Sequence, residues 1–299
     1  MITKERIKEV TVNLLQRAET SLPEDVNAAL RSAYERETSE IARVQLAAML
    51  ENIRLAEYLQ RPICQDTGLP IVFLKLGRLS ESLNLGDVEA GIREGVAAAT
   101  EQIPLRSNVV DPITRQGAGG NLGDKIPYIN YAVDPALDGL ELTVFPKGGG
   151  SENMSRFTML TPRQNEEALN AIKAFVLETV VEAGGKPCPP TIVGVGVGGS
   201  TDLAMKLAKL AVLRPIGERN KEDRIARLET ELLDAVNRTG IGPMGLGGAT
   251  TALDVHIETA GTHITGLPVA VNFQCWSARQ ASATIHADGK VEYKYVRNR

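Results

Sequence analysis

Several residue types that commonly build catalytic or metal sites are scarce in this chain of 299 residues. It contains three cysteines, three histidines and only 4 % aromatic residues. The cysteines form no CxxC pair and the histidines form no HxH or HExxH pattern, which argues against a zinc finger and against a zinc hydrolase. Ser200 lacks a GxSxG context, so a serine hydrolase has no support either.

An excess of positive charge and a long apolar run are also missing. The net charge is -4 at pH 7 and the pI is about 5.6, whereas nucleic-acid binding requires a basic surface. No apolar stretch reaches the length of a membrane span, and residues 2–22 interleave apolar and charged side chains, unlike a signal peptide. We therefore expect a cytoplasmic globular protein with no nucleic-acid and no membrane partner, in which thiols stay reduced.

The hydrophobic pattern predicts a mixed α/β fold, in which a helical N-terminal portion precedes a glycine-rich region of β-sheet surrounded by helices. A hydrophobic content of 43 % over this length can fill one large domain or two intimate ones. Periodicity predicts helices at residues 3–20, 24–36, 39–59, 81–103, 162–183, 201–213 and 222–240. It predicts strands at residues 71–77, 128–133, 255–261 and 268–276, a strand and turn within residues 191–200, and loops and strands within residues 140–153. Asp87 is the expected N-cap of the fourth helix. No repeat or linker marks a boundary, so we expect one domain over residues 1–299.

Gly194, Gly196 and Gly199 form a GxGxxG pattern between a predicted strand and a predicted helix. This context fits a dinucleotide-binding oxidoreductase, but no second strand ending in a ribose-binding acid follows about 20 residues later. The alternative is close packing of the strand against the helix, where only glycine lets the backbones approach. Either interpretation leaves a helix N-terminus at Ser200 or Thr201.

Two further features have both a functional and a structural interpretation. Gly148, Gly149 and Gly150 precede Ser151 and Asn153, and consecutive glycines can turn backbone N–H groups toward an anion, or simply form a turn. A second case is the histidine at position 256, which lies in an alternating, strand-like run. There a core imidazole is commoner than a metal ligand.

The three cysteines are Cys64, Cys188 and Cys275, separated by intervals of 124 and 87 residues. Each could be a small buried hydrophobe, as free cysteine often is. Yet polar or turn-forming residues surround all three, and three thiolates are one short of the four that usually close an iron-sulfur or structural zinc site. The pattern suggests an open metal site that the tertiary fold would have to assemble.

Six strings around these positions sharpen the interpretation. They are CQDTG at Cys64, PLRSNVVDP around Arg106, PKGGGSEN from Pro146, KPCPPTIVGVGVGGS around Cys188, LRPIG from Leu213 and NFQCW around Cys275. Together, and in this order, they resemble the class I, iron-sulfur-dependent fumarate hydratases and the related L(+)-tartrate dehydratases. The resemblance extends from the first helices to IHADG near the C-terminus.

This resemblance implies a [4Fe-4S] cluster held by Cys64, Cys188 and Cys275, with one iron lacking a protein ligand. Such an iron binds substrate and polarises the C–O bond of its hydroxyl, so that water is eliminated without a redox step.

The resemblance also implies a set of substrate-binding residues. Gln65 and Asp66 would touch the substrate, and Asp66 would position the catalytic proton. Arg106 would grip a carboxylate with its guanidinium fork, although a surface ion pair is the ordinary role of an arginine. Backbone donors for a second carboxylate would come from the segment containing Gly148, Gly149, Gly150, Ser151 and Asn153.

The chain is similar to the α subunit of the two-chain members of that family. A separate β subunit is therefore expected to complete the active site, in an α2β2 assembly. PKGGGSEN favours fumarate and (S)-malate as the substrate pair, with L(+)-tartrate as the alternative and other dicarboxylates such as mesaconate still open. A non-catalytic iron-sulfur scaffold or iron sensor is a further alternative, against which the substrate residues argue.

Overall fold

The structure, a computed structural model, describes residues 2–78 and 84–294. The chain divides into two compact units. Unit 1 comprises Met1–Glu24, Asn52–Gly149 and Arg279–Arg299, and unit 2 comprises Asp25–Glu51 and Gly150–Ala278. Because each unit is assembled from separate stretches, no single cut in the chain divides one from the other.

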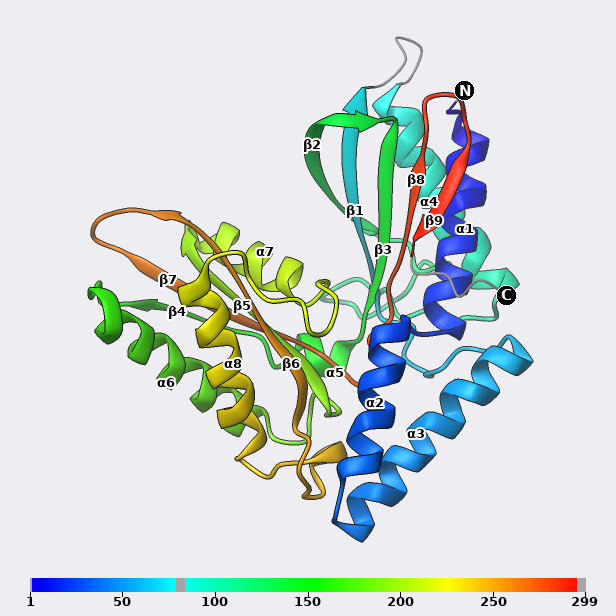
Figure 1. The fold of residues 1–299 in the computed structure, drawn as a ribbon. Coiled ribbons are helices and arrows are strands. Elements are labelled where there is room, and N and C mark those ends of the chain that lie inside the picture. The colour runs from blue at the N-terminus through cyan, green and yellow to red at the C-terminus, as the bar shows by residue number, and fades with distance from the viewer. Residues whose placement is uncertain (1, 79–83, 295–299) are drawn as a thin grey trace. The chain divides into compact units, whose positions relative to one another are not determined.

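Unit 1 contains a five-stranded sheet in the order β2-β1-β3-β8-β9 (Figure 1). The strands are β1 (Leu69–Arg78), β2 (Tyr128–Asp138), β3 (Leu140–Lys147), β8 (Ala281–Ile285) and β9 (Val291–Lys294). β1 runs parallel to β2, and every other neighbouring pair is antiparallel. The last strands of the chain thus complete a sheet that begins near residue 69.

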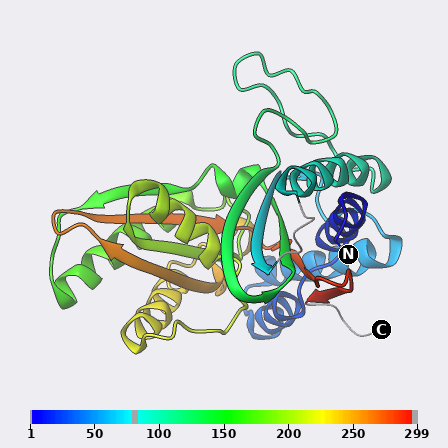
Figure 2. The ribbon, with the colours of Figure 1, turned by 90° about the horizontal axis from the view of Figure 1, so that it is seen from above.

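Two helices, α1 (Lys4–Thr20) and α4 (Leu85–Gln102), lie side by side against the unit 1 sheet (Figures 1 and 2). Their apolar faces fill a core with β1, β3 and β8, in which Leu14, Ile92 and Leu142 are fully buried. The Thr3 side chain accepts the Arg6 N–H at 3.2 Å, which satisfies a free donor at the start of α1. Between α4 and β2 the chain forms a long irregular loop.

Unit 2 contains a four-stranded sheet in the order β4-β7-β5-β6. Its strands are β4 (Arg156–Leu160), β5 (Thr191–Gly199), β6 (Ala252–Thr262) and β7 (Leu267–Gln274). β5 is parallel to β6 and antiparallel to β7. The helices α6 (Asn165–Ala183) and α8 (Asp223–Asn237) share one apolar core with β5, β6 and β7.

The helix α7 (Thr201–Ala211) packs closely on β5, with the small residues Ala204 and Ala208 at the contact. A Cβ atom on Gly196 would lie 2.0 Å from the Ala204 carbonyl oxygen, and one on Gly194 would lie 2.2 Å from that of Ala208. Both distances are shorter than any real contact, so only glycine fits. The packing interpretation of the GxGxxG pattern is confirmed.

The remaining elements are α2 (Glu24–Arg36), α3 (Glu40–Leu59), the short α5 (Gly149–Glu152) and a 3-10 turn at Pro243–Gly245. Two carboxylates at the ends of α2 hold loops of unit 2. Asp25 accepts the Ile216 N–H at 2.7 Å, and Glu37 accepts the Ala249 N–H at 2.8 Å. None of the described helices is long and apolar enough to cross a membrane.

The predicted mixed α/β fold is confirmed, while some local predictions are wrong. α4 is capped by Asn84, whose side chain accepts the Gly86 N–H at 2.9 Å, and Asp87 lies within the first turn. Residues 81–83, which the predicted helix included, lie outside the described residues. α6 begins three residues later than predicted, and β4, β8, β9 and α5 were not predicted.

Candidate functional site

The loop after α3 carries Cys64, Gln65 and Asp66, and the Asp66 carboxylate is the centre of its hydrogen bonds. Oδ1 accepts the Gly68 N–H at 2.9 Å and the Asn108 side-chain amide at 2.7 Å, and Oδ2 accepts the Gly149 N–H at 2.8 Å. The Asp66 N–H donates to Cys64 Sγ at 3.4 Å. Because all of these residues belong to unit 1, one carboxylate joins three predicted site segments within a single unit.

Asn121, a residue of the glycine-rich segment before β2, shapes the loop that carries Arg106. It is 1 % exposed; its side chain donates to the Arg106 carbonyl at 3.1 Å and accepts the Asn108 N–H at 2.7 Å. The Arg106 side chain is exposed and makes no ion pair with any residue that the structure describes. Its fork therefore remains available to an anionic ligand.

The segment of three glycines starts the short helix α5 rather than an open turn. The Gly149 N–H is already bonded to Asp66, so this donor serves the protein in the present structure. In unit 2, Ser151 is buried, Asn153 is exposed, and a Cβ atom on Gly150 would lie 3.3 Å from the Lys186 carbonyl oxygen. Gly150 thus lies close to the chain two residues before Cys188.

Glu152 connects α5 to two other elements of unit 2. Its carboxylate accepts from the Asn272 amide on β7 at 2.9 Å and pairs with Lys209 on α7. Asn272 also donates to the Ser155 hydroxyl at 2.7 Å. Asn272 lies three residues before Cys275, so α5 is fixed to the strand that leads into this cysteine.

Cys188 and Cys275 belong to neighbouring segments of unit 2. The Trp276 N–H donates to the Cys188 carbonyl at 3.1 Å, which joins the residue after Cys275 to Cys188 itself. Cys188 has φ = 54°, a conformation that costs a non-glycine residue energy and is commoner at functional sites. Cys275 follows the end of β7 directly.

None of the three cysteines forms a disulfide, and all three are half-buried. Partly accessible cysteine thiols outside disulfides are the donors that an iron-sulfur cluster requires, so the residues present fit such a group. Two of them lie in unit 2 and Cys64 lies in unit 1. Within the described residues no group of three or more His, Cys, Asp or Glu side chains is assembled as a metal site.

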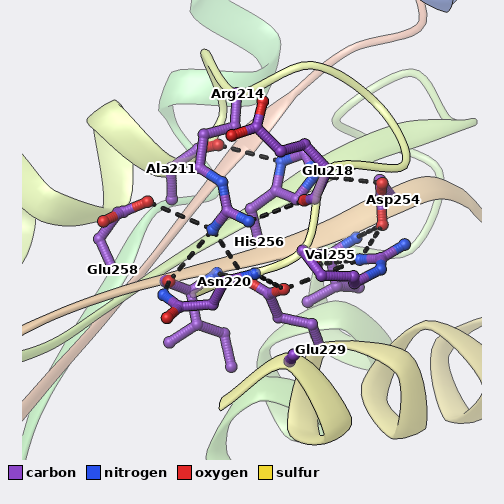
Figure 3. Close-up of polar contacts among 12 residues, drawn as sticks. Ala211, Arg214, Glu218, Asn220, Glu229, Asp254, Val255, His256 and Glu258 are labelled. Carbon is purple, nitrogen blue, oxygen red and sulfur yellow. Dashed lines mark hydrogen bonds and ion pairs between the residues drawn. The ribbon is translucent and has the colours of Figure 1, made fainter. Parts of the chain in front are cut away.

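His256 belongs to a buried polar network of unit 2 instead of a metal site (Figure 3). Its Nδ1 lies 3.1 Å from the Ala211 carbonyl oxygen at the end of α7, and its Nε2 lies 3.1 Å from Asp254 Oδ2. Asp254 also accepts the Gly217 N–H at 2.7 Å and pairs with Arg219 at 2.7 Å. Burial alone would raise the pKa of Asp254, but these donors, His256 foremost, hold that pKa below its usual value.

The same network explains the LRPIG string. Arg214 donates to Glu229 Oε1 at 2.8 Å and to the Glu218 carbonyl at 2.7 Å (Figure 3). Glu229, which is fully buried on α8, also accepts the Asn220 N–H at 2.9 Å. These contacts fix the loop after α7 to α8 and β6, so the structure gives this string a role in folding.

Sequence reasoning missed Asn108, Asn121 and Glu152. Asn108 stands within PLRSNVVDP and Glu152 within PKGGGSEN, whereas Asn121 stands in the glycine-rich segment QGAGGNLGDK, residues 116–125. Their position in those strings was the available signal, but their partners lie between 13 and 120 residues away in the chain.

The sequence profile described as "Fumarate hydratase (Fumerase)" matches residues 8–284. The chain belongs to the fumarate hydratase family. All the segments described above, from the Cys64 loop to the strand before Cys275, lie inside this match, so the family relationship covers the whole candidate site. Membership makes the chain one of a family of hydro-lyases.

Relatives with curated names are similar over nearly their full length. A protein of Methanocaldococcus jannaschii named "Putative L(+)-tartrate dehydratase subunit alpha" is 51 % identical over 287 residues, which is 96 % of this chain and 100 % of the relative. The "L(+)-tartrate dehydratase subunit alpha" of Escherichia coli K12 is 35 % identical over 283 residues, covering 95 % of this chain and 92 % of the relative. The protein of the same name from Shigella sonnei matches to the same extent.

Proposed function

We propose that this chain is the α subunit of an iron-sulfur hydro-lyase that eliminates water from a four-carbon 2-hydroxy dicarboxylate, with L(+)-tartrate the favoured substrate. The observation that carries the proposal is the nearly full-length similarity to relatives named as tartrate dehydratase α subunits. The arrangement around Asp66 is compatible with it, because a carboxylate, a free guanidinium and backbone donors serve the acid-base and anion-binding steps of dehydration.

Cys64, Cys188 and Cys275 are the proposed ligands of a [4Fe-4S] cluster, with one iron left without a protein ligand. When bound, the cluster would supply a Lewis acid for the substrate hydroxyl. Membership in the fumarate hydratase family and the similarity to tartrate dehydratase α subunits support this assignment.

The side chains of unit 1 then have distinct roles. Arg106 binds one substrate carboxylate through its exposed guanidinium, and Gln65, which is also exposed, contacts the substrate beside it. Asp66 positions the proton that is transferred, and the bonds from Asn108, Gly68 and Gly149 hold its carboxylate in place. Gly148, Gly150, Ser151 and Asn153 remain the proposed donors to a second carboxylate, whereas the Gly149 N–H is used by Asp66.

The proposed reaction is an elimination of water and needs no oxidant or reductant. The C–O bond at one hydroxylated carbon of tartrate breaks together with the C–H bond of the neighbouring carbon, and the hydroxyl and the proton leave as water. The enol that remains rearranges to oxaloacetate. With (S)-malate the same two bond cleavages give fumarate and water.

A separate β subunit is proposed to complete the active site in an α2β2 assembly. The relatives are named as α subunits, which supports a two-chain enzyme. Under this proposal the chain alone, reconstituted with iron and sulfide, has little or no hydro-lyase activity. Full turnover without a partner would refute the requirement for a β subunit.

Fumarate hydratase is the second candidate function. The family description and the PKGGGSEN segment favour it, whereas the names of the relatives favour tartrate. The deciding experiment is an anaerobic assay of the chain with its co-encoded partner on L(+)-tartrate and on (S)-malate. We expect a kcat/KM at least about tenfold higher for tartrate, which corresponds to about 1.4 kcal/mol of transition-state discrimination. The reverse preference would establish the second candidate, and activity on neither would reject the hydro-lyase proposal.

A further inference from the structure

A buried ion pair of unit 1 lies outside the proposed catalytic groups. Glu19, near the end of α1, is fully buried, and its Oε2 accepts from Arg279 Nη1 at 2.6 Å. Arg279 is itself 1 % exposed and stands four residues after Cys275 in the chain. A fully buried pair of charges between such distant parts of the chain needs a physical reason.

The backbone of Glu19 holds the residue that precedes Cys64. Its carbonyl accepts the Ile63 N–H at 2.8 Å, and the Asn52 side chain donates to the Ile63 carbonyl at 2.9 Å. The Ile63 side chain is 4 % exposed. Ile63 is therefore fixed at both of its backbone polar groups and at its side chain, one residue before the thiol.

The side chain of Glu19 faces the residues that follow the thiol. Glu19, Thr67 and Gly68 line the same small cavity. Its volume is about 10 Å³, which is at the lower limit of the space that one water molecule needs. Burial raises the pKa of Glu19 to about 7; the Arg279 charge opposes this shift and the Asp66 charge adds to it. The negative charge of Asp66 therefore contributes to the raised pKa of Glu19.

Stability alone does not account for this pair. Removing two charges from water costs several kcal/mol per ion, and apolar replacement of a buried pair is often neutral or stabilising. The cost is offset best when every polar atom is bonded, yet Glu19 Oε1 has no hydrogen-bond partner within the described residues. A buried ion pair can instead specify one conformation of the chain segments that it joins.

We propose that Glu19 and Arg279 are a positioning pair, which sets the place of the Cys64 thiol within unit 1. The proposal rests on the proposed function only in taking Cys64 as a cluster ligand. Neither side chain is proposed to touch the substrate.

The test measures the Cys64 thiol in the full-length chain without iron. The double variant Glu19→Leu with Arg279→Met removes both charges and keeps apolar volume, so it retains the fold better than either single removal. Each cysteine is alkylated with iodoacetamide and followed separately by mass spectrometry of its peptide. We expect the alkylation rate of Cys64 to rise at least about fivefold, since a half-buried thiol becomes more accessible when its segment is released.

Two conservative variants serve as controls. Glu19→Gln keeps an oxygen that accepts from Arg279, so the alkylation rate of Cys64 in this variant should equal the wild-type rate. Glu229→Gln alters another fully buried glutamate that pairs with an arginine, in unit 2, and should leave the Cys64 rate unchanged. A Cys64 rate in the double variant within twofold of wild type would overturn the proposal.

If circular dichroism shows that the double variant does not fold, the variant Arg279→Lys is used in its place. It keeps the charge but shortens the reach to Glu19, and a Cys64 rate within twofold of wild type again overturns the proposal. The alkylation assay uses neither cluster nor substrate, so its outcome is independent of whether tartrate or malate is turned over. Faster loss of iron from the reconstituted double variant is expected as a second readout.

Discussion

The carboxylate of Asp66 accepts the backbone N–H of Gly149 at 2.8 Å, although 83 residues separate the two in the chain. The same carboxylate binds Asn108, so the loop after α3, the loop after α4 and the start of α5 meet at one side chain. A residue proposed to position a proton is thereby restrained by neutral donors, none of which takes the proton itself. Removing the charge of Asp66 and removing one of its restraints should therefore have different effects.

Asp66→Asn should lower the kcat of the assembled enzyme by at least about 100-fold, because general acid-base catalysis commonly contributes that much. Its near-equal volume should preserve the fold and the iron content. Asn108→Ala removes only one restraint and should cost about tenfold in kcat. The measurements are anaerobic steady-state kinetics and iron analysis. Retention of more than half of the wild-type kcat by Asp66→Asn would contradict the role given to this residue.

Replacing any one of the three cysteines by serine should abolish the cluster. A serine hydroxyl is a poor substitute for a thiolate ligand, so the reconstituted variants of Cys64, Cys188 and Cys275 should each hold less than about a tenth of the wild-type iron. The check is iron and sulfide analysis after gel filtration. Thr230→Ser, a change of an exposed side chain on α8 in unit 2, provides a control. Unchanged iron content in one cysteine variant would remove that residue from the ligand set.

The raised pKa of Glu19 predicts a defined dependence of stability on pH. A carboxyl with a folded-state pKa of about 7 and an unfolded value near 4.3 binds its proton more tightly in the native state. Its contribution to stability is therefore full below about pH 4 and is lost as the pH rises to about 7. Urea unfolding should show wild type losing about 1 to 3 kcal/mol between pH 5 and pH 8 relative to Glu19→Gln. Parallel curves for the two proteins would show that the pKa is not raised.

Gly196→Ala should destabilise unit 2 through direct overlap. The new Cβ would lie 2.0 Å from the Ala204 carbonyl, and overpacking of this kind costs about 1 to 3 kcal/mol or more. Gly261→Ala at the end of β6 is the control, because a Cβ there meets nothing within 4 Å. Thermal unfolding should show a clear decrease in Tm for Gly196→Ala only. Equal Tm values for the two variants would mean that β5 and α7 are not in such close contact.

The elements that could be predicted from the sequence are those with strong local signals. α2 has the predicted bounds because its apolar residues repeat at helical spacing, and β5 follows from an unbroken run of small and β-branched residues. β8 was missed, since its sequence ASATI contains small residues that become strand only through pairing with β3. The N-cap of α4 was placed three residues late because Asn84 and Asp87 are both good capping residues.

The candidate site was predictable to the extent that it lies in recognisable strings. Asp66 was selected from CQDTG, but its bonds to Asn108 and Gly149 depend on contacts across 42 and 83 residues, which no local pattern encodes. Glu19 gave no signal at all, because an acidic residue in an amphipathic helix is usually solvated. Its burial depends on the ion pair with Arg279, which lies 260 residues later in the chain.

The place of β8 in the unit 1 sheet has a consequence for biosynthesis. Val144 of β3 pairs with Ala281 of β8, so 137 residues must be translated after one partner before the other exists. During that interval one edge of β3 lacks its native neighbour and offers free backbone groups to other chains. A ribosome adding about 5 to 20 residues per second leaves this edge open for about 7 to 27 s. The order of the strands therefore keeps one edge of the unit 1 sheet incomplete until nearly all of the chain has been made.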